Sequence, residues 1–471
     1  MSLLSPPQAP HQPLAAWAGA LADLAEAFGP ALRTDTSTRE QHGRGEGYAQ
    51  VLPPDAVLLA VSTEQVARAV SICARWKIPV IPYGAGTSLE GHITAPFGGL
   101  SIDLSGMDTV LRVSPDDLDC TVQAGVTREQ LNAHLRDKGL FFPIDPGANA
   151  TLGGMSSTRA SGTNAVRYGT MMSNVLALTV VLPDGSVIHT GGRARKSAAG
   201  YDLTRLFVGS EGTLGVITEV TLRLYGIPEA MSAATCAFET LEAAVATVVQ
   251  LVQSGVPVAR AEFMDEVQVA ASNRHSNLGL PEKPHIFFEF HGSTASVAEQ
   301  AATASELAQA NGGGAFAWAT LPEDRARLWK ARHQAYFAAL ALRPASEVLS
   351  TDVCVPVSAL VEVVAQTRRD IDTNRLIAPI VGHVGDGNFH VLFHLRRDDP
   401  DEMARVDAVH EAMIARALAA GGTCTGEHGI GAGKRDHLVD EHGAAAVALM
   451  RSLKRTIDPA GIMNPGKVFL D

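Results

Sequence analysis

Residues 81–92 read IPYGAGTSLEGH, and they follow a strand-like, a helical and a second strand-like run at residues 57–61, 64–76 and 78–81. Glycines at positions 84, 86 and 91 let neighbouring backbone N–H groups point inward, as in an anion-binding nest. The spacing G-x-G-x4-G differs from the dinucleotide fingerprint G-x-G-x-x-G and from a phosphate loop that ends in Lys-Ser or Lys-Thr. Taken alone, the loop is explained equally well by a turn between strands and by a phosphate site.

Two further glycine-rich runs lie in the same half of the chain, at residues 145–169 and 209–215. Both combine Gly with Ser, Thr or Asn, so they offer many hydrogen-bond donors and few bulky side chains. Such a surface suits a long ligand whose pyrophosphate lies along the backbone. Structural turns explain one such run easily and three of them poorly, so the pattern favours a ligand cradle.

The composition indicates a folded protein of several domains. The chain has 471 residues, of which 46% are hydrophobic and 19% charged, and this excludes an intrinsically disordered chain. At ~150 residues per domain, the length predicts about three domains. The net charge of −12 argues against nucleic-acid binding. No apolar run approaches ~18 residues, so we expect no transmembrane helix.

The cysteines and the N-terminal segment give information about the cellular compartment of the protein. Five cysteines are dispersed without a C-x-x-C pair, which excludes a disulfide framework, a zinc ribbon and an iron–sulfur site and indicates a reducing compartment. The N-terminus has neither the basic-flanked apolar segment of a secretory signal nor the Arg-rich composition of a transit peptide. We therefore expect a cytoplasmic protein, for which peripheral contact with a membrane is still allowed.

The pattern of strand-like and helical runs changes near residue 228. Before it, strand-like runs at residues 100–104, 119–124, 175–182 and 216–224 alternate with helical ones. After it, helical runs at 240–254 and 295–311 flank a strand at 286–290, which predicts a separate α+β domain of ~190 residues. Helices are also predicted at both ends of the chain, over residues 14–28, 405–420 and 444–457.

A predicted hairpin at residues 382–391, GHVGDGNFHV, brings two histidines together. If Asp386 and Gly387 form a two-residue turn, His383 pairs with His390 and their Cβ atoms lie ~5 Å apart. Glu427, in the stretch GEHG at 426–429, offers a third ligand. A His/His/carboxylate set with open positions suits Zn²⁺ or Mn²⁺. Because the chain holds 16 histidines, chance neighbours explain the pattern equally well.

Long motifs then identify a family. PYGAGTSLEG (82–91), DPGANATLGGM (145–155) and KSAAGYDLTRLFVGSEGTLGVIT (196–218) resemble the FAD-binding domain of the vanillyl-alcohol-oxidase, or PCMH, type. GHVGDGNFH (382–390), GTCTGEHGIG (422–431) and MNPGK (463–467) are similar to the FAD-linked D-2-hydroxyacid dehydrogenases, above all to their cytochrome-linked D-lactate branch. The resemblance covers about residues 50–471.

The resemblance implies an α+β protein with four segments. An N-terminal helix and loop (1–50) would precede a PCMH-type FAD-binding domain of two α/β subdomains (51–228). An α+β substrate or cap domain with the metal hairpin (229–424) would follow, and a C-terminal segment (425–471) would return to the flavin.

The resemblance also implies non-covalent FAD, because Thr87 and Ser88 stand where relatives with covalent flavin often carry His. It places Asn464 near the flavin ring. It assigns the rest of the FAD site to residues of the glycine-rich runs and the strand after them: Pro82, Tyr83, Gly84, Ala85, Gly86, Thr87, Ser88, Leu89, Glu90, Gly91, Pro146, Gly147, Leu152, Gly153, Gly154, Ser157, Ser161, Gly162, Asn164, Gly212 and Ile217.

By the same resemblance, two histidines and a carboxylate bind the divalent metal, Zn or Mn: His383, His390 and Glu427. His428 resembles the catalytic base of the family, and Arg332 resembles the residue that binds the substrate carboxylate. Tyr336 stands where the D-lactate enzymes carry Trp, which leaves the size of the pocket open.

The implied reaction is oxidation of D-lactate to pyruvate by metal-assisted proton abstraction and hydride transfer to flavin. Electrons would pass to cytochrome c or a quinone, and a homodimer is allowed. D-2-Hydroxyglutarate and glycolate are alternative substrates, although Val391-Leu392 after His390 favours a smaller, apolar hydroxyacid because hydroxyglutarate-type relatives tend to carry Leu-Asn there. A flavin-free zinc hydrolase that uses Glu427 or His428, and a glycine-rich binding protein without catalysis, are alternatives of other classes.

Overall fold

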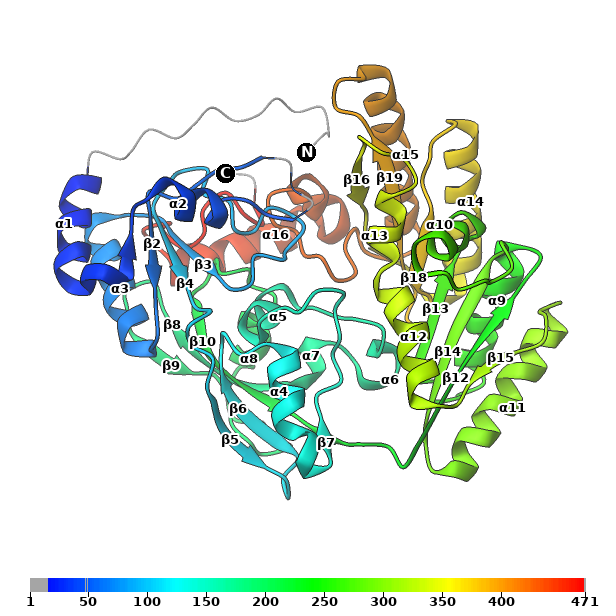
Figure 1. Ribbon diagram of the computed structural model, residues 1–471. Coiled ribbons are helices and arrows are strands. Elements are labelled where there is room, and N and C mark those ends of the chain that lie inside the picture. Colours follow the sequence, from blue (N-terminus) through cyan, green and yellow to red (C-terminus); the bar gives the residue numbers. More distant parts are fainter. Residues whose placement is uncertain (1–15, 47, 49, 470–471) are drawn as a thin grey trace.

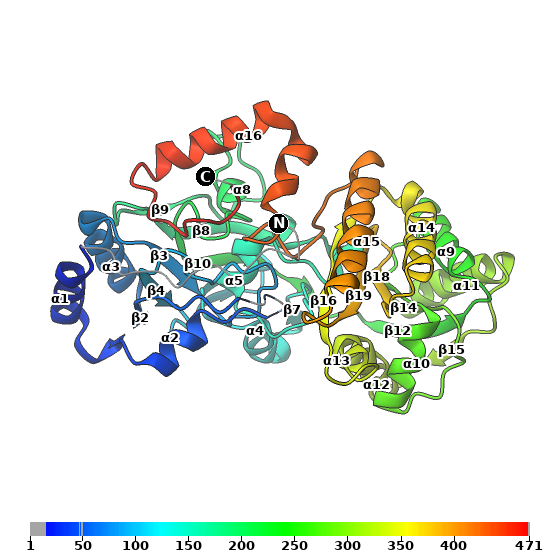
Figure 2. The same cartoon turned by 90° about the horizontal axis from the view of Figure 1, so that it is seen from above.

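A computed structural model describes residues 16–46, 48 and 50–469, which form two lobes side by side (Figure 1). The first lobe carries a four-stranded, a five-stranded and a two-stranded sheet, and the second carries one large sheet. Seen from above, the last long helix, α16, runs along one edge of the first lobe, although it follows the second lobe in sequence (Figure 2). Among the residues described, no helix is both long and apolar enough to span a membrane.

The first sheet of the first lobe is mostly parallel. Its strands run in the order β1 (Leu32–Arg33), β2 (Ala56–Leu59), β4 (Leu100–Asp103), β3 (Val80–Tyr83). β2, β4 and β3 are parallel, and the crossover helix is α3 (Thr63–Trp76), which buries Val66, Ala69, Val70 and Cys73 against the sheet. Helix α1 (Trp17–Phe28) precedes β1, and helix α2 (Thr36–His42) lies between β1 and β2; residues 14 and 15 of the predicted first helix fall outside the described part. The predicted strands and the crossover helix are thus confirmed.

The second sheet is antiparallel. Its strands run in the order β5 (Val110–Ser114), β6 (Asp119–Gln123), β10 (Val216–Arg223), β8 (Val175–Val181), β9 (Val187–His189). The helices and the two-stranded ribbon of this subdomain are α4 (Arg128–Leu135), α5 (Leu152–Thr158), α6 (Ala165–Tyr168), α7 (Met171–Asn174), α8 (Leu203–Phe207), and β7 (Leu140–Phe141) paired with β11 (Tyr225–Gly226). The first lobe therefore has the two α/β subdomains expected of it.

The large sheet of the second lobe is antiparallel. Its strands run in the order β15 (Ala317–Ala319), β12 (Ala230–Ala237), β14 (His285–Gly292), β13 (Arg260–Met264), β18 (Ile380–His383), β19 (Asn388–Leu395), β16 (Glu347–Ser350), and β17 (Val353–Cys354) also pairs with β19. Four helices pack in the hydrophobic core on one face of this sheet: α9 (Leu241–Gln253), α11 (Thr294–Ala310), α14 (Leu360–Thr373) and α15 (Pro400–Ala419). Helices α10 (Glu266–Ser276), α12 (Pro322–His333) and α13 (Ala335–Leu340) pack on the other face.

Strand side chains alternate between the two faces of a sheet, so one face of this sheet packs in the hydrophobic core and the other lines a cavity. Phe389, Val391 and Phe393 of β19 point into the core with α14 and α15. His390 and Leu392 point to the opposite face, which is the face that lines the cavity between the lobes.

The C-terminal segment returns to the first lobe, as expected. Helix α16 (Leu438–Ile457) has a break at Gly443, where φ is +77°, and the part after this break is the predicted helix at 444–457. Beyond it, Met463 forms a parallel bridge with Val80, and Asn464 N donates to Val80 O at 2.8 Å. The tail therefore continues the first sheet next to β3.

A buried polar network joins the lobes. Arg260 of β13 lies 3.1 Å from Asp145 of the first lobe and donates to Asn164 Oδ1 at 3.0 Å. Tyr168 OH and His291 Nδ1 are 2.8 Å apart across the same boundary. A buried ion pair of this kind fixes the lobes in one relative arrangement, because breaking it would leave a charge unpaired.

This network predicts a dependence of stability on pH. Burial raises the pKa of Asp145, but the charge of Arg260 and hydrogen bonds from His333 and Thr163 outweigh burial and lower it to about 2. The folded state therefore holds this proton less tightly than the unfolded state, and the stabilisation, about 2 kcal/mol, is present above pH ~4 and is lost toward pH ~2.

We expect the difference in free energy of unfolding between wild type and Asp145→Asn to shrink by about 2 kcal/mol over that range. Urea unfolding at stepped pH measures it, with the more exposed Asp324→Asn as the control. A difference that does not change with pH would contradict the assignment.

Candidate active site

A cavity of ≈ 610 Å³ lies where the lobes meet. Its walls come from the loop after β3, the segment between β7 and α6, the inner face of the large sheet and the C-terminal segment. All three glycine-rich runs therefore reach one cavity, together with the histidine hairpin.

At three glycines of the first-lobe wall of the cavity there is no room for a side chain. A Cβ at Gly84 would lie 2.4 Å from Thr151 Oγ1, and one at Gly86, where φ is +73°, would lie 2.4 Å from the Tyr83 hydroxyl. A Cβ at Gly153 would lie 2.5 Å from that of Ala124. The result is a backbone-lined cradle, which fits a dinucleotide such as FAD.

Most of the residues assigned to FAD line this cavity: Pro82, Tyr83, Gly84, Ala85, Gly86, Thr87, Ser88, Leu89, Pro146, Gly147, Gly153, Gly154, Ser157, Ser161, Gly212, Ile217 and Asn464. Three others lie behind the wall. Leu152 is fully buried in the lobe core, and a Cβ at Gly162, where φ is +152°, would lie 2.5 Å from the Asp145 backbone. Asn164 donates to Pro143 O and accepts from Arg260.

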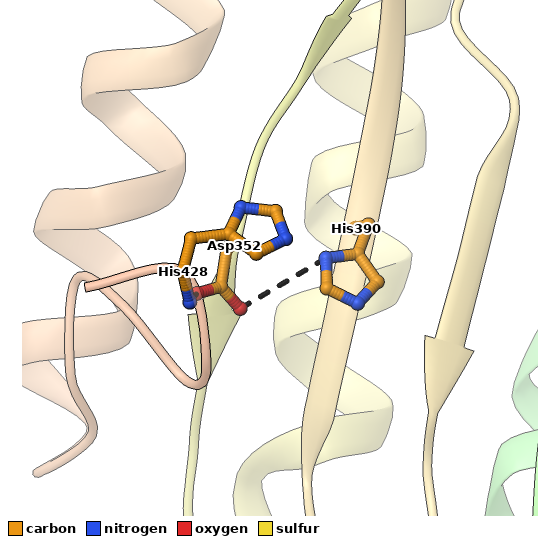
Figure 3. A group of neighbouring side chains, drawn as sticks. All are labelled: Asp352, His390 and His428. Carbon is orange, nitrogen blue, oxygen red and sulfur yellow. Dashed lines mark hydrogen bonds and ion pairs between the residues drawn. The ribbon is translucent and has the colours of Figure 1, made fainter. Parts of the chain in front are cut away.

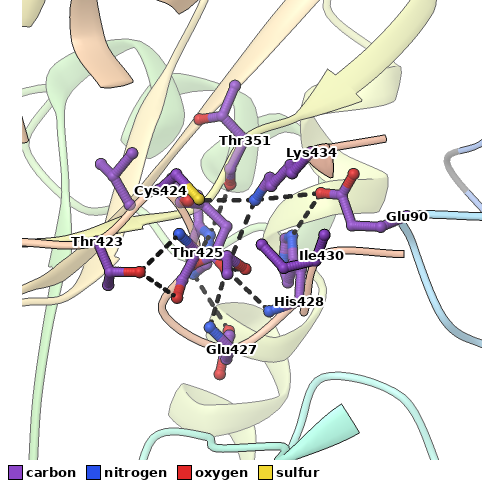
Figure 4. A network of polar contacts seen from close by, with 12 residues as sticks. Glu90, Thr351, Thr423, Cys424, Thr425, Glu427, His428, Ile430 and Lys434 are labelled. Carbon is purple, nitrogen blue, oxygen red and sulfur yellow. Dashed lines mark hydrogen bonds and ion pairs between the residues drawn. The ribbon is translucent and has the colours of Figure 1, made fainter. Parts of the chain in front are cut away.

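Glu90 and Gly91 also lie off the cavity wall. The Glu90 carboxylate lies 3.2 Å from Lys434 Nζ, and its carbonyl accepts from Ala432 N at 2.8 Å (Figure 4). A Cβ at Gly91 would lie 3.0 Å from the Tyr48 ring. These two residues face neighbouring protein segments, which a glycine spacing does not distinguish from a ligand.

The predicted register of the histidine hairpin is wrong. His383 pairs with Asn388, and His390 pairs with Val381, so the turn has four residues, Val384–Gly387. The histidines still share a face, because His390 lies two residues beyond the partner of His383. Their ring centroids are 5.4 Å apart.

His383, His390 and Glu427 form a set that can bind a metal. Glu427 Oε1 lies 3.2 Å from His383 Nε2 and 3.3 Å from His390 Nε2. The three ligand atoms lie within 4.8 Å of one another. Glu427 Oε2 is buried and has no hydrogen-bond partner among the described residues. Two imidazoles and an unsatisfied carboxylate oxygen fit a divalent cation.

Further groups orient both imidazoles. Glu262 of β13 lies 2.8 Å from His383 Nδ1, and Thr351 O lies 2.8 Å from His390 Nδ1. These contacts turn Nε2 of each ring toward Glu427, where a metal would bind. Burial lowers the pKa of His383, but Glu262 and Glu427 outweigh it and hold the pKa well above the ordinary value. The surroundings are therefore negative and favour a cation.

His428 lies beside this set, with its ring stacked on that of His390 at a centroid distance of 5.2 Å. Its Nδ1 is buried, lies 4.0 Å from Glu90 Oε1 and has no hydrogen-bond partner among the residues described (Figure 4). Burial lowers the pKa of His428 against the opposing charge of Asp352. A neutral imidazole at the cavity wall is able to accept a proton.

Asp352 supports both sides of this arrangement, and the sequence reasoning missed it. Its Oδ2 accepts from Glu427 N and His428 N at 2.8 Å each, and its Oδ1 lies 3.9 Å from His390 Nδ1 (Figure 3). Burial raises the pKa of Asp352, but His428 and Lys434 outweigh it, so the pKa lies below the ordinary value. No local pattern around Asp352 signals this role.

Arg332 and Tyr336 lie on the cavity wall opposite the cradle, at the end of α12 and in α13. Arg332 Nη2 lies 2.6 Å from Glu262 Oε2, while its buried Nε has no hydrogen-bond partner in the described part of the chain. A held guanidinium with a free donor fits a carboxylate ligand. Glu262 thus contacts both Arg332 and His383, and its position in β13 carries no sequence signal of this.

Two more residues of the cavity wall, His92 and Glu211, were not predicted as site residues. Their side chains are 3.2 Å apart, although they are 119 residues apart in sequence. Both lie in glycine-rich runs. The sequence pattern therefore marked these segments as part of a ligand site, but it was interpreted in terms of backbone N–H groups and not of these two side chains.

Solved structures share this fold. p-Cresol methylhydroxylase superposes with a TM-score of 0.77 at 18% identity and covers 98% of both chains. 4-Ethylphenol oxidase from Gulosibacter chungangensis gives 0.77 at 20% identity, with 98% of both chains covered. The fold is therefore the PCMH type expected from the motifs.

Curated relatives are similar over most of the chain. Probable D-lactate dehydrogenase, mitochondrial, of Danio rerio is 53% identical and covers 92% of this chain and 88% of its own. D-lactate dehydrogenase (cytochrome), mitochondrial, of Arabidopsis thaliana is 44% identical, and the matched region covers 93% of this chain and 78% of that relative. A glycolate oxidase subunit of Bacillus subtilis is 33% identical and covers 88% and 89%.

The mitochondrial names contradict the predicted cytoplasmic location. The five cysteines are free in the structure, and free thiols do not single out the cytoplasm.

Two family models match the chain: the FAD binding domain over residues 54–191 and the C-terminal domain of FAD linked oxidases over residues 227–468. The chain belongs to the FAD-linked oxidases, and it carries the FAD-binding domain and the C-terminal domain of that family.

Proposed function

We propose that this chain oxidises D-lactate to pyruvate with non-covalent FAD and a divalent metal, Zn or Mn. The observation that carries the proposal is the convergence of Arg332, His428 and the His383, His390 and Glu427 set on the cavity that the glycine cradle lines. The names of the Danio rerio and Arabidopsis thaliana relatives support D-lactate as the substrate.

The geometry supports an assignment of residues to each group. Bound FAD would supply two-electron redox chemistry, and a cation on His383, His390 and Glu427 would supply Lewis-acid chemistry. Glu262 and Thr351 O would keep the imidazoles turned toward such a cation.

The chain's own residues bind the substrate and move a proton. Arg332 binds the substrate carboxylate, and its contact with Glu262 holds the guanidinium in place. His428 accepts the proton of the substrate hydroxyl at an imidazole nitrogen, which its lowered pKa keeps unprotonated near neutral pH.

The wall around the substrate position favours a small apolar side chain. Val381, Leu392, Tyr336 and Phe337 line the cavity on the side of Arg332. A methyl group such as that of lactate is compatible with this wall, whereas a second carboxylate would lose hydration against it.

We further propose cytochrome c or a quinone as the electron acceptor, and a homodimer as the assembly. The net charge of −12 is compatible with a basic cytochrome, and the Arabidopsis thaliana relative is named for cytochrome. Stopped-flow reoxidation with each acceptor tests the first point, and light scattering tests the second.

The visible spectrum during anaerobic addition of D-lactate tests the reaction. We expect yellow protein that bleaches on addition of substrate, with bleaching slowed by prior treatment with a chelator and restored by Zn²⁺ or Mn²⁺. Colourless purified protein would favour a flavin-free zinc hydrolase instead.

Substrate preference separates the alternatives within the family. We expect kcat/KM for D-lactate to exceed that for D-2-hydroxyglutarate and for glycolate, which is the second candidate because of the Bacillus subtilis relative. A preference of more than about tenfold for the dicarboxylate, worth about 1.4 kcal/mol, would overturn the choice of substrate.

A further inference from the structure

Glu211 adopts a backbone conformation that suits glycine, and yet it carries a buried carboxylate. Its φ is +54°, between Gly209 at +87° and Gly212 at +72°, and the residue is 6% exposed. Left-handed conformations are disfavoured for residues with a Cβ, and burial of a carboxylate is costly unless it is paired. Both costs indicate that the side chain itself is needed at this position.

The carboxylate of Glu211 holds the segment that follows His428. Its Oε1 accepts from Ile430 N and its Oε2 from Gly431 N, each at 2.7 Å. A Cβ at Gly429 would lie 2.7 Å from Glu211 Oε1, so the close approach requires glycine there. We call residues 426–433 the base loop.

Neighbouring groups hold Glu211 itself. His92 Nε2 lies 3.2 Å from its Oε2, and Asn464 Nδ2 donates to the carbonyls of Glu211 and His92 at 2.8 and 3.1 Å. Burial raises the pKa of Glu211, but His92 and the two backbone N–H groups outweigh it and hold the pKa below the ordinary value.

The base loop is thus held by one carboxylate from each lobe. Asp352 of the second lobe accepts from Glu427 N and His428 N, and Glu211 of the first lobe accepts from Ile430 N and Gly431 N. Asp352 therefore holds the part of the loop that carries Glu427 and His428. Glu211 connects the following part, Ile430 and Gly431, to the first lobe, which contains the glycine cradle.

We propose that Glu211 is a positioning residue that sets the place of His428 relative to the FAD-binding lobe. The proposal rests on the proposed function, in which His428 is the base. Because Asp352 still holds Glu427 when Glu211 is changed, the metal site should survive while proton transfer suffers.

The test is Glu211→Gln in the holoenzyme. Glutamine keeps the size but offers only one acceptor oxygen, so one of the two backbone N–H groups loses its partner. We expect the rate constant for anaerobic flavin reduction by D-lactate to fall on the order of 10²-fold, because small displacements of reacting groups have effects of that size. FAD content and metal content should match wild type.

Glu402→Gln is the matched control. Glu402 is also a buried glutamate, accepts from Arg396 N and pairs with Arg343, but it does not line the cavity. Its loss should leave flavin reduction unchanged.

A double-mutant cycle separates positioning from support of the fold. When His428 is already alanine, adding Glu211→Gln should cause no further loss in the rate of flavin reduction. An equal loss in both backgrounds, loss of FAD, or wild-type reduction by Glu211→Gln would each overturn the proposal. Normal flavin reduction by His428→Ala alone would instead refute the proposed base.

If Glu211→Gln does not fold, Gly429→Ala decides. Its Cβ would push against Glu211 Oε1 from the base loop while all charges remain. The same slow reduction with FAD and metal retained supports the proposal, and wild-type reduction contradicts it.

Discussion

Replacing His428 by alanine is expected to slow flavin reduction by D-lactate by about 10²–10⁴-fold, the usual contribution of a positioned general base. The imidazole lines the cavity, is stacked on His390 and is kept neutral because burial lowers its pKa. FAD should stay bound, because the cradle is built from the glycine-rich runs of the first lobe, which do not include His428. Anaerobic stopped-flow absorbance measures the rate constant, and the flavin spectrum measures the FAD content.

His442→Ala is the matched control for this variant. His442 lies in the same C-terminal segment, its side chain is 41% exposed, and it does not line the cavity. Unchanged reduction by His428→Ala, with the control also unchanged, would refute the base assignment.

Replacing His383 by alanine is expected to remove metal and activity together. The change leaves His390 and Glu427 as the remaining ligands, and it removes the imidazole that lies 2.8 Å from the buried Glu262 carboxylate. Loss of a group that merely orients a ligand costs about 10–100-fold in metal affinity, so loss of a ligand should cost more than about 100-fold. Elemental analysis gives the metal content, and steady-state kinetics give the activity.

His394→Ala is the control on the same strand. His394 is fully buried in β19 and faces Ser346, and it does not line the cavity. The folded fraction of this variant should keep its metal. Persistent metal in His383→Ala would count against His383 as a ligand.

The histidine hairpin shows how far local pattern reaches. Asp386-Gly387 between apolar arms predicted two antiparallel strands with both histidines on one face, and the structure has them. The register predicted from the pattern was wrong, because loop length depends on contacts outside the hairpin. One such contact is that of Val355 N, which donates to the Gly387 carbonyl.

The glycine-rich runs show the same limit. Their spacing predicted a backbone-lined cradle, and most of the assigned residues line the cavity. Glu90 and Gly91 share the pattern but face Lys434 and Tyr48 instead. The spacing of glycines indicates that another group lies close to the backbone at these positions, but it does not indicate whether that group belongs to a ligand or to the protein.

The sequence alone determined the fold family, the FAD-binding domain and the two histidines that face each other, because each depends on long local motifs. Only the tertiary structure revealed Glu262, Asp352 and Glu211, the buried carboxylates that hold Arg332, His383 and the base loop. The physical reason is that a buried carboxylate gains its role from partners brought to it by folding, here from 70 to 220 residues away. Such partners leave no periodic trace in the sequence around them.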